Sequence, residues 1–236
     1  ASWRSGATGM LDLVLRNATL PDGRVADLSF RDGTLLHIGS AGRADVEIQC
    51  RGLLCIPAAT DIHVHMRGGI QSAKEDWRTG TMAALAGGVT MVVDQPNTIP
   101  PLFSCKPFQN RIEEASAGAL CSFGINGGVS TDSDPLPLWH AGAMAFGEIF
   151  AAPSSYGDAL TLEELRDALP AIHSLGAPAT IHCEQVLPGS PDSLIDHNIL
   201  RSAEGEAESF QQIRSAIPKG MKPHICHISS VSYTHL

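Results

Sequence analysis

From Leu11 to about Cys55 the chain alternates apolar and polar positions in short segments. The segments LDLVLRN, VADLSFRD, TLLHIG and VEIQC follow a period of two, and turns such as Pro-Asp-Gly and Asp-Gly separate them. This alternation is typical of strands that bury one face. The pattern therefore predicts a small antiparallel β unit as the first domain, over residues 10–56.

After Pro57 the pattern changes to apolar strands that alternate with helices. Strands are predicted over residues 56–64, 89–96, 120–126, 143–150, 178–184 and 223–230. Helices are predicted over residues 74–86, 108–119, 161–176 and 200–217, with only a weak helix between Asn126 and Gly142. Strands that alternate with helices indicate βαβ units around a parallel sheet.

Two architectures contain such units, the open doubly wound sheet and the (β/α)8 TIM barrel. An open nucleotide-binding sheet usually carries an early GxGxxG turn, which the chain lacks. Instead, polar residues follow several of the predicted strands, as at the catalytic face of a barrel. The prediction is an α/β fold, an incomplete TIM barrel of about six βα units over residues 57–230.

Histidines stand at the ends of three of these strands. In the stretch DIHVHMRGG, His63, His65 and Arg67 alternate and therefore share one face of a strand. Two imidazoles at i and i+2 can reach one metal ion, although a partly exposed histidine pair would look the same in sequence. His182 in TIHCE and His227 in HICHISS end two later strands, and this recurrence favours a metal site.

The last predicted strand carries two histidines three positions apart, so only one can face the barrel interior. With His227 facing inward, Ile225 and Ser229 share its face. Cys226 then faces the outer helices, as Cys183 does beside His182, and neither thiol is expected to bind metal. The six cysteines form no CxxC pair and are interpreted as buried cytoplasmic thiols.

Two adjacent divalent ions need a bridging anion, which is often a carboxylated lysine in sites of this kind. None of the four lysines lies near the fourth barrel strand, which reads AMAFGEI. Met144, Phe146 and Glu148 are expected to share a face there, so Glu148 is the candidate bridging ligand. A helix cap or a surface carboxylate is the alternative interpretation. The predicted metal ligands are His63, His65, Glu148, His182 and His227.

Composition narrows the choice of partner. The chain has 236 residues, of which 43% are hydrophobic, and a net charge of −9. That charge argues against nucleic acid or an anionic membrane surface as a partner. No apolar run reaches the ~18 residues of a membrane span, and no signal peptide is apparent, so we expect a cytoplasmic protein.

Five separated segments resemble the amidohydrolase superfamily and, within it, dihydroorotases of the cyclic-imidase group. They are DIHVHMR, KEDWRTGTMAALAGGVTMVVDQPNTIPP, ATIHCE, LRSAEGEAE and HICHISS, in the order of that family. The resemblance implies a TIM barrel with a small β-sandwich, to which residues 10–56 contribute. It also implies one or two zinc ions and the interconversion of dihydroorotate and N-carbamoyl-aspartate in pyrimidine biosynthesis.

The resemblance also implies roles for individual residues. His63 and His65 would bind the more buried metal, and His182 and His227 the second. Arg67 and Asn97 match residues that hold the substrate carboxylate, and a guanidinium suits a carboxylate as a bidentate partner. An ordinary salt bridge for Arg67 and a turn for Asn97 are the alternatives. The proton donor to the leaving nitrogen would be an aspartate on strand eight.

Residues 59–236 are fewer than the ~250 of a typical barrel, so we expect a C-terminally truncated chain without strands seven and eight. The chain as given is then expected to be inactive, and the complete protein to be a homo-oligomer. Residues 231–236, VSYTHL, do not continue the family pattern and are expected to be a non-native tail.

Two rival functions remain open. The first is another cyclic amidase, such as an allantoinase or a dihydropyrimidinase, although such relatives tend to have Asp or Asn where Arg67 stands. The second is a non-catalytic scaffold that binds another pyrimidine-pathway enzyme, such as aspartate transcarbamoylase. Scaffolds of that kind usually lose their ligand histidines.

Overall fold

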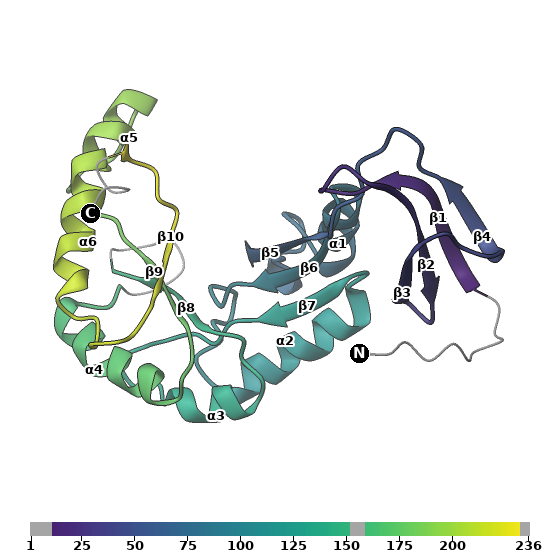
Figure 1. Ribbon diagram of the computed structural model, residues 1–236. Coiled ribbons are helices and arrows are strands. Elements are labelled where there is room, and N and C mark those ends of the chain that lie inside the picture. The colour runs from purple at the N-terminus through teal and green to yellow at the C-terminus, as the bar shows by residue number, and fades with distance from the viewer. Residues whose placement is uncertain (1–10, 152–158, 232–236) are drawn as a thin grey trace. The chain divides into compact units, whose positions relative to one another are not determined.

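A computed structural model describes residues 11–151 and 159–231, which divide into two compact units (Figure 1). The first unit extends to Ala58 and the second begins at Ala59. Met10 and residues 232–236 of the expected tail lie outside the described residues. Within the described ranges, no helix is long and apolar enough to cross a membrane.

The first unit is a four-stranded sheet in the order β3-β2-β1-β4. Its strands are β1 (Leu11–Thr19), β2 (Val25–Arg31), β3 (Thr34–Gly39) and β4 (Ala44–Gln49). The β1–β2 and β2–β3 pairs are antiparallel, as predicted, but β4 pairs with β1 in parallel. The prediction of an antiparallel unit was therefore wrong for β4, because alternation shows which face a strand buries and not the direction of its neighbour.

Arg16 on β1 holds the connection that brings β4 back beside β1. Its guanidinium lies 2.8 Å from Asp27 Oδ2 and 2.8 Å from Glu47 Oε1. It also donates hydrogen bonds to the carbonyl oxygens of Ala41 and Gly42. One side chain thus binds β2, β4 and the β3–β4 connection, which fixes the parallel crossover.

The second unit contains six parallel strands in two three-stranded sheets, in the orders β5-β6-β7 and β10-β9-β8. A parallel bridge between Gly127 and Phe146 links the end of the first sheet to the start of the second. The strands are β5 (Ala59–Val64), β6 (Val89–Asp94), β7 (Ser122–Ile125), β8 (Phe146–Phe150), β9 (Ala179–His182) and β10 (His224–Cys226). The predicted alternation of strands and helices is confirmed.

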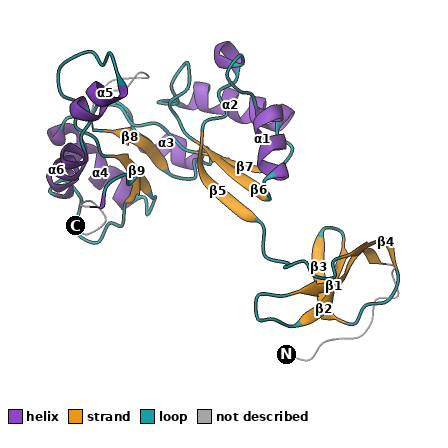
Figure 2. Cartoon of the chain, turned by 90° about the horizontal axis from the view of Figure 1, so that it is seen from above, coloured by secondary structure: helices purple, strands orange, loops and turns teal. Residues whose placement is uncertain are grey.

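Most helices of the second unit cover its strands and bury their apolar residues (Figure 2). They are α1 (Trp77–Ala86), α2 (Cys105–Gly118), α3 (Pro135–His140), α4 (Leu162–Ser174), α5 (Leu194–Leu200) and α6 (Ala203–Arg214), with a short 3-10 helix η1 (Gly69–Gln71). The prediction missed α5, which buries none of its residues and therefore shows no apolar stripe. Phe108, Phe146 and Ile181 are among the fully buried side chains of the shared core.

A buried ion pair anchors the loop that follows β5. Asp94, at the end of β6, is fully buried and accepts a 2.8 Å hydrogen bond from the Met66 amide. Its second carboxylate oxygen accepts a 2.8 Å hydrogen bond from Nε of Arg111 on α2. Arg111 Nη1 donates in turn to the carbonyl oxygen of Arg67, and the guanidinium carbon lies 4.8 Å from the centre of the Trp77 ring. The backbone around Arg67 is therefore fixed by groups from two neighbouring elements.

Replacing Asp94 by asparagine is expected to lower the free energy of unfolding by about 2–3 kcal/mol, because the buried Arg111 guanidinium loses the fully buried one of its two carboxylate partners, Asp94 and Glu114. Urea unfolding measures the change, with Asp132→Asn at an exposed position as the control. The double variant with Arg111→Met should lose less than the sum of the two single variants. Losses that add to within about 0.5 kcal/mol would show that the two groups are not coupled.

Candidate metal centre

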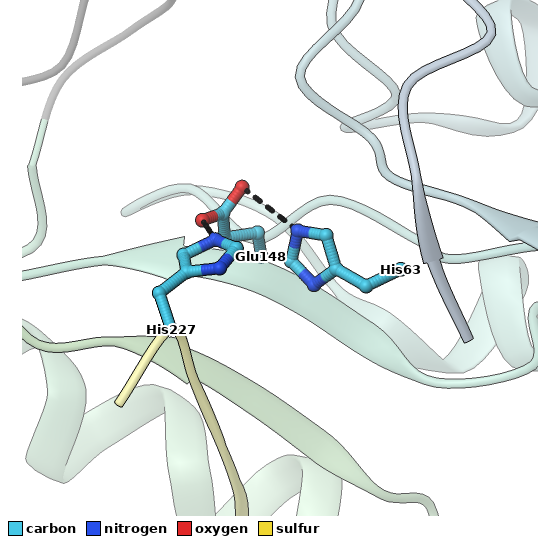
Figure 3. A group of neighbouring side chains, drawn as sticks. All are labelled: His63, Glu148 and His227. Atoms are coloured by element: carbon cyan, nitrogen blue, oxygen red, sulfur yellow. Dashed lines mark hydrogen bonds and ion pairs between the residues drawn. The ribbon is translucent and has the colours of Figure 1, made fainter. Parts of the chain in front are cut away.

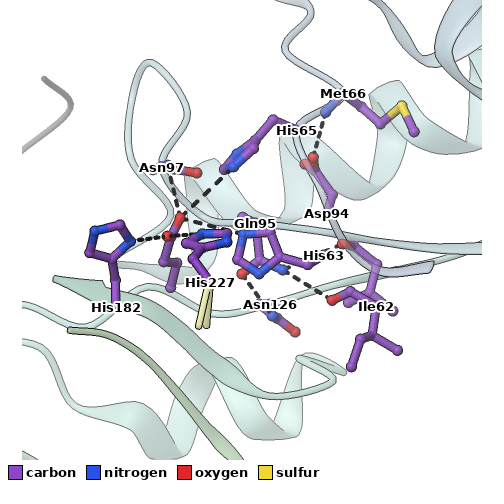
Figure 4. A network of polar contacts seen from close by, with 12 residues as sticks. Ile62, His63, His65, Met66, Asp94, Gln95, Asn97, Asn126, His182 and His227 are labelled. Atoms are coloured by element: carbon purple, nitrogen blue, oxygen red, sulfur yellow. Dashed lines mark hydrogen bonds and ion pairs between the residues drawn. The ribbon is translucent and has the colours of Figure 1, made fainter. Parts of the chain in front are cut away.

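Glu148 on β8 lies at the centre of a cluster formed by all five predicted metal ligands (Figure 4). Its side chain is almost completely buried. Oε1 lies 2.8 Å from His182 Nδ1 and 2.7 Å from His227 Nε2. Oε2 lies 3.6 Å from His63 Nε2 and 3.8 Å from His65 Nε2. The two carboxylate oxygens therefore face two different pairs of histidines.

The cluster forms where the carboxyl ends of parallel strands meet. His63 lies near the end of β5 and His65 directly follows it, whereas His182 ends β9 and His227 follows β10. Figure 3 shows that the imidazoles of His63 and His227, which come from distant parts of the chain, both point toward the Glu148 carboxylate. Parallel strands bring such distant positions together at one edge, which is where α/β folds place their ligands.

The route by which His227 reaches the cluster differs from the prediction. In the β9–β10 register Cys226 pairs with His182, so Cys226, and not Ile225, occupies the inward-facing position of β10. His227 turns toward Glu148 because its backbone is left-handed, with φ 55°, and this breaks the strand alternation. The predicted outward direction of Cys226 was therefore wrong, whereas Cys183 does belong to the hydrophobic core. Burial raises the pKa of the Cys226 thiol to about 12, which disfavours the thiolate that a metal would need.

Glu148 also reaches the site by a route that simple alternation does not describe. Phe146 is fully buried in the hydrophobic core and does not line the cluster with Glu148. The β8–β9 register shifts between Phe146 and Ile149, and Gly147 between them has φ 118°. A Cβ atom at position 147 would collide with the Thr180 carbonyl oxygen. Glycine is thus required at 147 for β8 to turn the Glu148 carboxylate inward.

The electrostatics of the cluster suit a cation. Burial alone would raise the pKa of Glu148, but the hydrogen bond from His182 and the nearby imidazole of His63 outweigh it and hold that pKa well below its usual range. Burial, with the nearby charge of Arg67, lowers the pKa of His65 to about 4. Burial would lower the pKa of His182 as well, but its hydrogen bond to Glu148 raises it overall. At neutral pH the carboxylate is therefore charged and His65 offers a neutral imidazole.

The residues present fit a divalent metal ion. Ligand atoms of His63, Glu148 and His227 all lie within 4.8 Å of one another. His63 Nε2 and Asn97 Oδ1 are buried at this site without a hydrogen-bond partner, and buried polar atoms of that kind normally have one. Imidazole nitrogens together with a carboxylate are a donor set that zinc accepts.

The two predicted substrate-binding residues take different positions around the cluster. Asn97 lies inside it, with Nδ2 3.5 Å from Glu148 Oε2 and its side chain close enough to His65 to influence the pKa of that imidazole. Arg67 is half-buried at its edge, close enough for its charge to lower the pKa of His65. Its backbone is left-handed, with φ 49°, in the loop that Asp94 and Arg111 anchor.

Sequence reasoning missed several polar residues that support the site. Gln95 and Asn126 are buried amides that bond to each other at 3.1 Å, and Gln95 also donates to the carbonyl oxygen of Ile62, so they join β5, β6 and β7. In the sequence, the only feature that could have identified Gln95 and Asn126 is that each is a polar residue at the end of a strand. Glu184 lies two residues beyond His182 in the sequence. This spacing could have identified Glu184 as a neighbour of a predicted metal ligand.

A cavity of about 400 Å³ adjoins the cluster on the side of β9 and β10. It is lined by His182, Glu184, Arg201, Glu206 and His227, with smaller residues around them. Arg201 and Glu206 both belong to the segment LRSAEGEAE; Arg201 forms an ion pair with Glu184, and Glu206 accepts a hydrogen bond from the Ser229 amide. The cluster of histidines around Glu148 therefore adjoins a space large enough for a small molecule.

No protein-family model matches the chain. Curated proteins do match it, among them the dihydroorotase of Methanosarcina mazei, which is 39% identical over 87% of this chain and 48% of its own length. The dihydroorotase of Methanosarcina acetivorans is 38% identical over 88% of this chain and 47% of its own length. The allantoinase of Rubrobacter xylanophilus is 30% identical over 93% of this chain and 52% of its own length. The chain thus spans about half the length of the curated relatives it matches.

Solved structures share the fold. The L-hydantoinase (dihydropyrimidinase) of Arthrobacter aurescens superimposes with a TM-score of 0.82 at 23% identity, over 93% of this chain and 53% of that one. A D-hydantoinase superimposes with a TM-score of 0.74 at 23% identity, over 96% of this chain and 54% of that one. The fold is thus that of the hydantoinase amidohydrolases.

The homologues of this chain are cyclic amide hydrolases. Three of these homologues are named dihydroorotase and are 31–39% identical to this chain.

Proposed function

We propose that the complete protein is a zinc-dependent dihydroorotase, which interconverts dihydroorotate and N-carbamoyl-L-aspartate in de novo pyrimidine biosynthesis. The observation that supports this most strongly is the position of Glu148, whose two carboxylate oxygens face two separate pairs of histidines. The sequence similarity to dihydroorotases supports the choice of reaction.

In this proposal His63 and His65 would hold one zinc ion, His182 and His227 would hold the second, and Glu148 would supply the carboxylate ligand that both could share. Zinc supplies Lewis-acid activation of water and of the amide carbonyl at neutral pH. Glu148 remains ionised for this role, since its pKa lies well below its usual range. The low pKa of His65, about 4, keeps its imidazole free of a competing proton.

Arg67 and Asn97 orient the substrate. The Arg67 guanidinium forms a bidentate pair with the ring carboxylate, and Asn97 adds a hydrogen bond from inside the cluster. Because Asp94 and Arg111 fix the loop that carries Arg67, little of the binding free energy is spent on ordering that loop. The proton for the leaving nitrogen is assigned to an aspartate on strand eight of the complete barrel.

The proposal includes the finer features of the whole protein. It is a (β/α)8 barrel whose first six units are those of residues 57–230, with residues 10–56 as part of a β-sandwich. It is a cytoplasmic homo-oligomer that acts on a small-molecule substrate.

A second candidate activity is allantoinase or dihydropyrimidinase, which is favoured by the similarity to the allantoinase of R. xylanophilus and by the hydantoinase fold. Turnover of dihydroorotate, allantoin and dihydrouracil by the complete protein separates the two. We expect kcat/KM to be highest for dihydroorotate, because Arg67 complements its carboxylate. A higher kcat/KM for either of the other rings would replace our assignment.

The scaffold alternative needs no metal. All four histidines and Glu148 converge here, which argues against loss of the metal site. Zinc analysis of protein prepared without chelators tests this alternative, since protein that contains no zinc would favour the scaffold.

A further inference from the structure

His182 differs from the other histidines of the cluster in having carboxylates at both ring nitrogens. Its Nδ1 lies 2.8 Å from Glu148 Oε1, on the side of the proposed metals. Its Nε2 lies 3.3 Å from Glu184 Oε2, on the opposite side of the ring. Across residues 11–151 and 159–231, His63, His65 and His227 have ion-pair contacts only to Glu148.

Glu184 is itself held in place. Its other oxygen, Oε1, lies 2.5 Å from Arg201 Nη1, and both side chains are partly buried, with 24% of Glu184 and 34% of Arg201 exposed. Arg201 caps the C-terminus of α5, and its own amide bonds to the carbonyl oxygen of His197. The loop that carries Glu184 is tied to the same helix end by a 2.9 Å hydrogen bond from the Leu187 amide to the Leu200 carbonyl oxygen. The carboxylate therefore has a fixed position behind the imidazole.

With a metal ion at Nδ1, this arrangement would select one tautomer of the imidazole. A neutral histidine can offer only one nitrogen to a metal, and the other must carry the proton. The carboxylate behind Nε2 would accept that proton in a hydrogen bond, and Nδ1, which faces Glu148, would give its lone pair to the metal. Carboxylates behind ligating histidines fix their orientation in this way and raise their basicity.

We propose that Glu184 and Arg201 are positioning residues for the metal ion held by His182 and His227, with Arg201 orienting Glu184 and Glu184 orienting His182. This inference rests on the proposed metal-dependent function. It assigns a role to a residue that sequence reasoning had not singled out, and a partner to Arg201. It also makes the two proposed metal positions unequal, because the His63–His65 position has no such support.

The test is a zinc titration of the purified chain and of its Glu184→Gln and Arg201→Met variants, with affinity measured against a competing chelator. We expect the variants to bind the zinc ion at His182 and His227 about 10- to 100-fold less tightly and to keep the affinity for the ion at His63 and His65. Glu208→Gln on the exposed side of α6 is the matched control and should leave both affinities unchanged. The retained ion also reports that each variant is folded.

Nitrogen-15 NMR of the histidine rings gives a readout that a merely structural role would not change. In the zinc-loaded chain we expect His182 to be metal-bound through Nδ1 and protonated at Nε2. In Glu184→Gln, a second population with the opposite tautomer should appear. Unchanged zinc affinities, or equal loss of both ions, would overturn the positioning role. A wild-type chain that binds no zinc would instead refute the proposed function, so the two failures are distinguishable.

Discussion

Replacing Glu148 by glutamine is expected to lower the zinc affinity of the chain by at least about 100-fold and to abolish binding of two ions. The carboxylate is the only anion placed between the two histidine pairs in the described part of the chain, with Oε1 at 2.7–2.8 Å from one pair and Oε2 at 3.6–3.8 Å from the other. An amide of the same size keeps the packing but carries no negative charge to offset the repulsion between two divalent cations. Equilibrium dialysis with zinc measures the effect.

The matched control for this variant is Glu113→Gln on α2, where the side chain is exposed. It should bind zinc as the wild-type chain does. If Glu148→Gln binds the same number of zinc ions with the same affinity, Glu148 has a structural role and is not a bridging ligand.

Replacing Arg67 by glutamine in the complete protein is expected to lower kcat/KM for dihydroorotate by about 100- to 1,000-fold. A site built to pair with a substrate carboxylate loses both the charge and the bidentate geometry when the guanidinium is removed. Zinc content should stay unchanged, because Arg67 lies at the edge of the metal cluster and contributes no ligand atom. Steady-state kinetics and metal analysis of the same preparation measure both quantities.

Arg214→Gln is the control, since Arg214 is exposed at the end of α6. Rings that lack a carboxylate, such as dihydrouracil, should be turned over no worse by Arg67→Gln than by the wild type. An equal loss of kcat/KM for both kinds of ring would show that Arg67 supports the fold and not the recognition of the carboxylate.

The sequence carried enough information to predict which strands bring ligands to the site. The HxH pair in β5, and the single histidines after β9 and β10, follow from the fact that parallel strands end at one edge. Four of the five proposed ligands are histidines with clear positions in this pattern. Glu148 was found by asking which group could bridge two cations, and the structure places it between the histidine pairs.

Backbone geometry accounts for the details that sequence periodicity did not predict. Alternation assigned the wrong face to Cys226, because the left-handed backbone of His227 turns the His227 side chain to the site although Cys226 occupies the inward-facing position of the strand. It also placed Phe146 beside Glu148, whereas Gly147 interrupts the register of β8. A period of two describes an uninterrupted strand, and functional sites often lie where that period is broken.

Contacts between residues distant in sequence were the other omission. Glu184 reaches Arg201, and Asp94 reaches Arg111, only after helices and strands have packed. The parallel partner of β4 likewise depends on Arg16 binding groups from three segments. Such pairings have no local signature in a single sequence.

The most direct test of the central claim is zinc-dependent hydrolysis of dihydroorotate by the complete protein. We predict that protein stripped of metal has no ring-opening activity and that added zinc restores it, with turnover following the occupancy of the site around Glu148. Absence of turnover in fully zinc-loaded protein, or turnover that persists after zinc is removed, would contradict the assignment.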